Sequence, residues 1–227
     1  MKAALAALVV TLAAAAALAP AGGATNECHG IQACIRVVGP WVVVPARGQT
    51  VYLLTCPAGR SVVAGLDAQV TSRDVRVEFV GRIGAPVQPG VTTTRYALFR
   101  AVSISGRVQA FQPLLGCVPA QGGGGRSTVS AYVSPPGQSP EYRSRITVLS
   151  PGSVGFVSVT CQGRERLVDS WNALAFRTKK PPPLSNASRV DARKVIVGKK
   201  VVLSATASDG LSIDAHAIVQ VGAECAP

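Results

Sequence analysis

Two stretches give the clearest indication of the fold, Val51-Tyr-Leu-Leu-Thr-Cys56 and Phe156-Val-Ser-Val-Thr-Cys161, because each is a short apolar run that ends in Thr-Cys. In the second run, two valines and the cysteine alternate with Ser158 and Thr160. Alternation with a period of two residues is typical of an antiparallel strand that buries one face. Both stretches therefore predict β-strands.

The rest of the chain has the same β character. Val75–Phe79 alternates apolar and charged residues, and three further segments, 93–104, 194–207 and 211–221, are rich in β-branched residues. The composition is 48% hydrophobic, which excludes a disordered chain. A single Met and the absence of a long amphipathic stretch argue against a helical bundle. We therefore expect an all-β, antiparallel fold.

The sequence repeats at an offset of about 105 residues. The two Thr-Cys runs match at this offset, and the pattern Gln112, Cys117, Pro119 returns near the C-terminus as Gln220, Cys225, Pro227. A repeat of this length predicts two modules. Strands of this kind, joined by a long-range disulfide, favour a β-sandwich for each module. We expect an N-terminal module at 25–120, a Gly/Pro-rich linker at 121–140 and a C-terminal module at 141–227.

The cysteines follow the same register, since each module has one early and one late cysteine. The remaining two lie close together near the N-terminus and can close a small loop. Even numbers of cysteines in exported chains usually form disulfides. The expected pairs are Cys28–Cys34, Cys56–Cys117 and Cys161–Cys225.

The N-terminus has the pattern of a secretory signal peptide. Met1-Lys2 precedes an apolar run at 3–19, and small residues follow it. We expect residues 1–24 to be removed after Ala24, with cleavage after Ala21 as the alternative. No later apolar run reaches 18 residues, so no membrane span is expected after processing. The predicted location is extracellular or at the cell envelope.

One motif carries a family resemblance. Cys56-Pro-Ala-Gly59, followed by Val62-Val-Ala-Gly65, resembles a Cys-Pro-Ala-Gly motif of secreted bacterial β-rich repeat modules, commonly from actinobacteria. Those modules also tend to end in a late cysteine. The sequence Cys161-Gln-Gly-Arg164 departs from the motif, so the resemblance of the second module depends on the repeat. The resemblance implies an extracellular β-fold and supplies no catalytic residues.

Two polar clusters could carry chemistry, and a structural interpretation is preferred for each. Ser212, Asp214 and His216 would share one face of a strand, but the serine lies on the wrong side of the aspartate for a triad. We interpret this face, which also holds Gln220, as the solvated one. Cys28-His29 with Cys34 could suggest zinc, but zinc sites usually need four ligands, so a disulfide is preferred.

Two further patterns are interpreted as surface features. Glu165 and Asp169 are expected to join a surface cluster of ion pairs with neighbouring arginines. The sequence Asn186-Ala-Ser188 is an acceptor pattern for glycosylation, which we expect to be unused. The sequence therefore predicts no catalytic residues, no metal site and no cofactor.

Charge is the most informative functional signal. The net charge is +12, and the segment 177–200 holds eight basic residues against Asp191 alone. Such a stretch attracts polyanions. It contains no aromatic residues for base stacking, so no specific nucleic acid is expected. The candidate anion-binding residues are Arg177, Lys179, Lys180, Arg189, Arg193, Lys194, Lys199 and Lys200.

The sequence thus predicts a secreted, non-catalytic structural or binding protein of the cell envelope. The expected partner is an anionic cell-wall polymer or polysaccharide, or else another protein. A basic surface that only keeps the protein soluble is the simpler interpretation of the same charges. Two other functions stay open: a secreted hydrolase with an unrecognised active site, and an adhesin or inhibitor that binds a protein.

Overall fold

The computed structural model describes residues 27–29, 34–57, 61–80, 91–92, 95–119, 130–131 and 140–227. The predicted signal peptide at 1–24 lies outside the described residues. Of the predicted linker at 121–140, only Ser130–Ala131 and Pro140 are described. The predicted module boundaries therefore stay a prediction.

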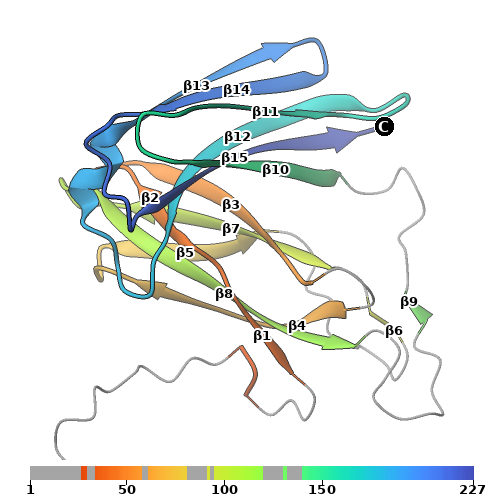
Figure 1. Ribbon diagram of the computed structural model, residues 1–227. Coiled ribbons are helices and arrows are strands. Elements are labelled where there is room, and N and C mark those ends of the chain that lie inside the picture. The colour runs from red at the N-terminus through yellow and green to blue at the C-terminus, as the bar shows by residue number, and fades with distance from the viewer. Residues whose placement is uncertain are drawn as a thin grey trace, which may run out of the picture.

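The described chain is almost entirely β-structure, which confirms the predicted all-β fold (Figure 1). Every strand pair is antiparallel except β6 with β9. The first half contains β1 (Ile35–Val38), β2 (Trp41–Val44), β3 (Gln49–Thr55), β4 (Ser61–Val70), β5 (Val75–Val80), β6 (Val91–Thr92), β7 (Tyr96–Ser103) and β8 (Gln109–Pro119). After β9 (Ser130–Ala131), the second half contains β10 (Glu141–Leu149), β11 (Val154–Thr160), β12 (Arg166–Arg177), the 3-10 helix η2 (Leu184–Arg189), β13 (Val190–Val197), β14 (Lys200–Ala207) and β15 (His216–Ala226).

Seven strands form a central sheet in the order β1-β8-β2-β12-β15-β10, with β4 on the other side of β8. The two halves meet in this sheet, because β2 pairs with β12 through Val42 opposite Ala175 and Trp41 opposite Phe176. Two three-stranded sheets complete the fold. The N-terminal sheet is β3-β7-β5, and the C-terminal sheet is β11-β14-β13. The halves are thus joined by strand pairing, in addition to the chain that links them.

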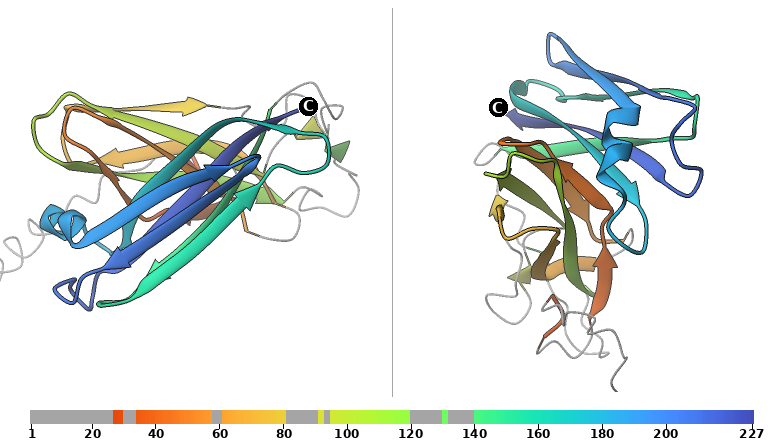
Figure 2. Two further views of the ribbon diagram at one scale, coloured as in Figure 1. Left: turned by 90° about the horizontal axis from the view of Figure 1, so that it is seen from above. Right: turned by 90° about the vertical axis from the view of Figure 1, so that its left-hand side faces the viewer.

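The two small sheets cover opposite faces of the central sheet. Neighbouring residues of β2 show this, since Val42 and Val44 pack in the core under the N-terminal sheet while Val43 packs in the core of the C-terminal half. On β15, Ile218 belongs to the first core and Val219 to the second. Figure 2 shows the blue C-terminal strands and the orange-to-green N-terminal strands gathered on two sides of the molecule.

The three disulfides have the predicted pairing. Cys56 follows β3 and is bonded to Cys117 on β8, so this bridge ties the N-terminal sheet to the central sheet. Cys161 follows β11 and is bonded to Cys225 on β15, which ties the C-terminal sheet in the same way. Both long bridges are buried at the edges of the two cores. In the loop-entropy model each contributes about 4 kcal/mol.

The third disulfide joins Cys28 to Cys34 beside the face of the central sheet that points away from the N-terminal sheet, since Gly116 lies between Leu115 and Cys117 of the first core. Gly65 on β4 and Gly116 on β8 are opposite each other, and the backbone carbonyl of Glu27 packs onto both. A β-carbon at either glycine would overlap this carbonyl. The two glycines therefore leave the space that the Glu27 carbonyl occupies.

Gln220 does not lie on a solvated face, which corrects the sequence interpretation. Its side chain is only 2% exposed, because the N-terminal sheet covers this face of β15. The Leu53 amide donates to Oε1 of Gln220 at 2.8 Å, and Nε2 of Gln220 donates to the Leu53 carbonyl at 2.9 Å. Since β3 is an edge strand, the glutamine amide takes the place of a neighbouring strand there.

Trp171 also contacts the other half of the molecule. Its ring lies over Gly222, its cross-strand partner on β15, and packs with Leu53 and Leu98 of the N-terminal sheet. The ring also makes an edge contact with Tyr142, with ring centroids 6.2 Å apart. Trp171 therefore fills the junction of the two halves, unlike the tryptophan of an immunoglobulin core, which packs against the disulfide of its own domain.

Candidate anion-binding site

The predicted basic residues are spread along the second half, and some of them lie at its two ends. Arg177 is the last residue of β12 and pairs with His216 at the start of β15. Lys199 lies in the turn between β13 and β14, and Lys200 is the first residue of β14. The Lys199 carbonyl accepts a hydrogen bond from the Cys161 amide. Because a strand rises about 3.3 Å per residue, the length of β15 places these groups about 30 Å apart. The basic stretch is therefore not one patch.

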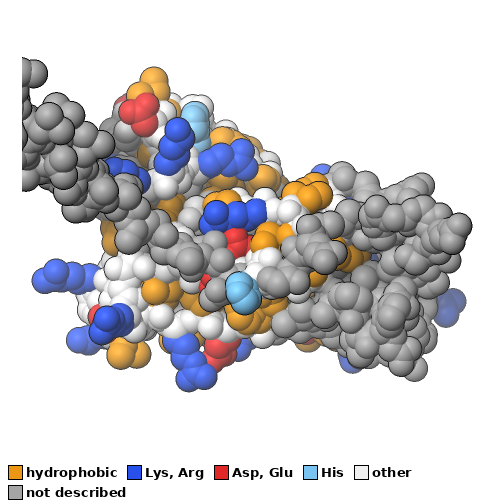
Figure 3. Space-filling view, turned by 90° about the horizontal axis from the view of Figure 1, so that it is seen from below, with side chains coloured by type: hydrophobic (Ala, Val, Ile, Leu, Met, Phe, Trp, Pro, Cys, Tyr) orange, Lys and Arg blue, Asp and Glu red, His pale blue; other side chains and the backbone are white. Residues whose placement is uncertain are grey.

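Several of these side chains have structural contacts. Nζ of Lys194 donates to the Ser170 carbonyl at 2.6 Å, and Nζ of Lys199 donates to the Gly163 carbonyl at 2.6 Å. The remaining candidates are exposed: Arg177 ends β12, Lys179 and Lys180 follow it, Arg189 ends η2, Arg193 lies on β13 and Lys200 begins β14. Figure 3 shows basic side chains spread over one face of the molecule without forming a single cluster.

The structure brings two of the predicted residues together with two others that the sequence did not single out. A groove of about 850 Å³ lies where the halves meet, and its basic lining residues are Arg36, Arg145, Arg177 and Lys179. The rest of its described lining is apolar or uncharged and includes Tyr52, Gln112 and Gln220. No acidic side chain is among the described residues that line it. We call this the first groove.

Three of the four cations in the first groove are available to a ligand. Arg36 forms an ion pair with Glu27, at 2.5 Å between Nε and Oε1. Within the described part of the chain, no acidic side chain forms an ion pair with Arg145, Arg177 or Lys179. A cleft lined by charges of one sign concentrates the electric field and attracts counter-ions. The first groove is therefore suited to an anion.

Tyr52 contributes a neutral hydroxyl to the first groove. Its side chain is almost completely buried. Burial raises the pKa of the Tyr52 phenol to about 12, and the positive charge of Arg177 acts in the opposite direction. The phenol is therefore protonated at neutral pH, so it adds no negative charge beside the cations.

A second groove, of about 610 Å³, continues from the first. The two grooves share Leu53, Thr55, Ser144 and Arg145. The second groove adds Lys200 and Arg143 to the basic residues, and none of its described lining residues is acidic. Lys200 is thus the third predicted residue that lines this continuous surface.

Arg143 already has an acidic partner. Its guanidinium donates to both carboxylate oxygens of Glu165, at 2.6 and 2.8 Å. These bonds lower the pKa of the Glu165 carboxyl, and the Gln162 amide, which donates to it at 2.6 Å, acts in the same direction. The predicted cluster of ion pairs around Glu165 and Asp169 is therefore a single defined pair with Arg143. Among the described residues the adjacent arginines take no part in it.

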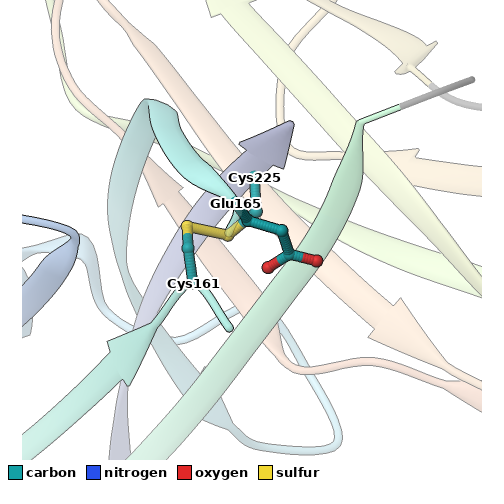
Figure 4. Close-up of side chains that lie close together, drawn as sticks. All are labelled: Cys161, Glu165 and Cys225. Carbon is teal, nitrogen blue, oxygen red and sulfur yellow. A yellow bond between two sulfur atoms is a disulfide. The ribbon is translucent and has the colours of Figure 1, made fainter. Parts of the chain in front are cut away.

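Glu165 also lies beside the Cys161–Cys225 disulfide (Figure 4). The carboxylate and the two sulfurs are close enough for a metal site by distance alone. The sulfurs are oxidised, however, and metal ions bind the thiolate form of cysteine. The carboxylate is occupied by Arg143. The donor set therefore does not fit a metal ion.

The other sequence candidates remain dispersed. Ser212 and Asp214 lie in an exposed turn and not on a strand, since β15 begins at His216. Cys28 is disulfide-bonded, which leaves His29 exposed beside it. Asn186 is 8% exposed, so its amide is inaccessible for glycan attachment.

Arg36 and Arg145 were missed because their relation to the basic stretch is tertiary. Arg143 and Arg145 alternate along β10, a pattern visible in the sequence, but only the tertiary structure places Arg145 in both grooves and Arg143 in the second.

No family model, curated protein or solved structure matches this chain. None of the helices in the described part of the chain has the length and apolar character that a membrane crossing requires.

Proposed function

We propose that this protein is a secreted, non-catalytic binding protein of the cell envelope, and that it binds an anionic polymer through the first groove. The observation that carries the proposal is the convergence of Arg145, Arg177 and Lys179 on one groove whose described lining contains no carboxylate. Each of these residues comes from the second half, while β3 and the segment around Gly39 supply the opposite wall.

The construction of the groove supports binding more than catalysis. Its described polar residues are cations, amides and hydroxyls, and none is a carboxylate, histidine or thiol that could act as a general base or nucleophile at neutral pH. Exposed cations attract anions without demanding one geometry, so they suit a polymer with repeated charges. The three disulfides support an oxidising compartment, as secretion would provide.

The experiment measures retention of the mature protein on an immobilised acidic polymer across a salt gradient. One variant combines Arg145→Gln, Arg177→Gln and Lys179→Gln. The matched control removes the same charge from exposed arginines that line neither groove: Arg73→Gln, Arg107→Gln and Arg164→Gln.

We expect the groove variant to elute at much lower salt than the control. The slope of log K against log salt should fall by about one for each cation that contacts the polymer, hence by about two to three. Equal retention of the two variants would mean that net charge alone governs binding, and the groove would then have no role.

A further inference from the structure

The two grooves lie in sequence along the edge of the central sheet. They share Ser144 and Arg145, which belong to β10, and β10 is the last strand of that sheet. Arg177 at the end of β12 and Lys200 at the start of β14 lie at the two ends of this surface, and Arg145 on β10 lies between them. Arg145 is opposite Val221 of the second core, and Arg177 is opposite His216, on the face of Ile218 in the first core. The row therefore passes over the edge of the sheet, and the strand pairing gives its spacing along the strands.

Strand β15 supplies the scale for that row. Arg177 is opposite His216 and Arg145 is opposite Val221, the fifth residue after His216. At about 3.3 Å per residue these two positions are about 16 Å apart along the strand. The far end is near Cys225, which is bonded to Cys161.

Lys200 lies at that end of the row of cations. It is opposite Thr160, the residue before Cys161, and it lines the second groove. The four residues from Val221 to Cys225 add about 13 Å, so the row of cations extends for about 30 Å. A small anion can contact only one of these cations at a time. A chain with repeated charges can contact all of them, and each contact then raises the effective concentration of the next.

The uncharged residues that line the second groove indicate which class of polymer would bind there. Ser158, Thr160 and Gln162 line it together with Tyr96 and Tyr142. Burial raises the pKa of both tyrosines, so their hydroxyls are protonated at neutral pH. Hydroxyl and amide groups both donate and accept hydrogen bonds, as sugar hydroxyls do. A polyphosphate chain has only acceptors to offer between its charges.

We propose that the two grooves form one track for a linear acidic polysaccharide, which lies along β10 from Arg177 to Lys200 and crosses Arg145 at the midpoint. This inference rests on the proposed function and adds the class of polymer, the path and the minimum length. A chain shorter than about 30 Å cannot bind both ends of the track.

The test measures binding of the mature protein to size-fractionated oligogalacturonates, from the dimer to the polymer, by titration calorimetry at constant ionic strength. Polyphosphate and single-stranded DNA of matched charge are the comparison ligands. The variants are Arg145→Gln, at the midpoint, and Arg107→Gln as the control outside both grooves. Thermal unfolding of each variant verifies that the fold is retained.

We expect affinity to rise steeply with chain length and to level off once the chain reaches about 30 Å. Arg145→Gln should weaken binding of long chains about ten-fold and leave the dimer almost unchanged, while Arg107→Gln should change neither.

Each negative result of this binding test has a different meaning. If the parent protein binds none of the polyanions, the proposed function itself is wrong. If it binds them with an affinity independent of length, the first groove alone is used and the track is refuted. If Arg145→Gln behaves like the control, the polymer does not contact Arg145 in either groove, and the track is refuted as well. If polyphosphate or DNA binds more tightly than galacturonate of equal charge, the polysaccharide assignment is wrong.

Discussion

Replacing Gln220 with Leu should weaken the contact between the two halves of the molecule and lower the free energy of unfolding. The side chain of Gln220 is 2% exposed and makes two hydrogen bonds to the backbone of Leu53, on the opposite half. Leucine has a similar volume, so the substitution removes the hydrogen bonds without leaving a large cavity. The Leu53 amide and carbonyl would then be buried without partners.

The magnitude follows from those two groups. A buried donor or acceptor left unpaired costs about 1–3 kcal/mol. Two such groups give an expected loss of about 3 kcal/mol in the free energy of unfolding, since an edge strand can shift slightly and admit water. The bond from Trp171 to Oε1 of Gln220 is 3.4 Å long and should add little.

Gln112 provides the matched control. It occupies the corresponding place on β8, is 8% exposed and makes one bond, from Nε2 to the Gly39 carbonyl at 3.0 Å. This bond stays within the first half, so Gln112→Leu should cost about 1 kcal/mol. The assay is urea unfolding of the disulfide-intact protein, combined with amide hydrogen exchange at Leu53. The reasoning is refuted if Gln220→Leu lies within about 0.5 kcal/mol of the parent, or if exchange at Leu53 does not accelerate.

Two further predictions concern the N-terminal loop and the acid stability. Gly116→Ala should displace the Cys28–Cys34 loop and destabilise the protein by about 1–3 kcal/mol, because the new methyl group would overlap the Glu27 carbonyl. The control is Gly106→Ala, where the nearest atom to the new methyl group is 4.0 Å away, and it should be neutral in the same urea assay. Because its pKa is lowered in the folded protein, Glu165 should stabilise the fold at pH values above the ordinary glutamate pKa of about 4.3. This stabilisation should be lost as the pH falls through the pKa that Glu165 has in the folded state. Glu165→Gln should therefore flatten the pH dependence of stability below about pH 5, and an unchanged pH profile would exclude a contribution from this pair.

Local sequence patterns predicted the strands and the disulfides because both depend on short-range regularities. Alternation in the run that ends at Cys161 gives the inward and outward faces of β11, and the doubled Thr-Cys register pairs Cys161 with Cys225. The match was less reliable between the cysteines. The offset of 105 residues matches Trp171 to Leu66. The strand pairing instead aligns Trp171 with Asp67, since each is opposite a residue three positions before the late cysteine of its half. A slip of one residue exchanges the faces of a strand, so the role of Trp171 could not be derived from the repeat.

The sequence interpretation of Gln220 was wrong for a related reason. Alternation assigns one face of a strand to the core, and a polar residue on the other face is then assigned to solvent. On β15 the second face is covered by a sheet from the other half of the chain. The signal that could have revealed this is the run from Ala217 to Ala223, where both faces are apolar apart from Gln220. Strands buried on two faces show such continuous runs.

The all-β fold, the three cysteine pairs and the excess of positive charge could all be predicted from the amino-acid sequence. Which of the charges lie close together depends on how the strands pair in the folded protein. Arg177 and Lys200 belong to one basic stretch in the sequence, yet an extended strand separates them by about 30 Å. Arg36 and Arg145 are distant from that stretch in the sequence, yet they line the same groove as Arg177. Electrostatic interaction depends on separation in space, and in a β-fold that separation is set by strand length and pairing.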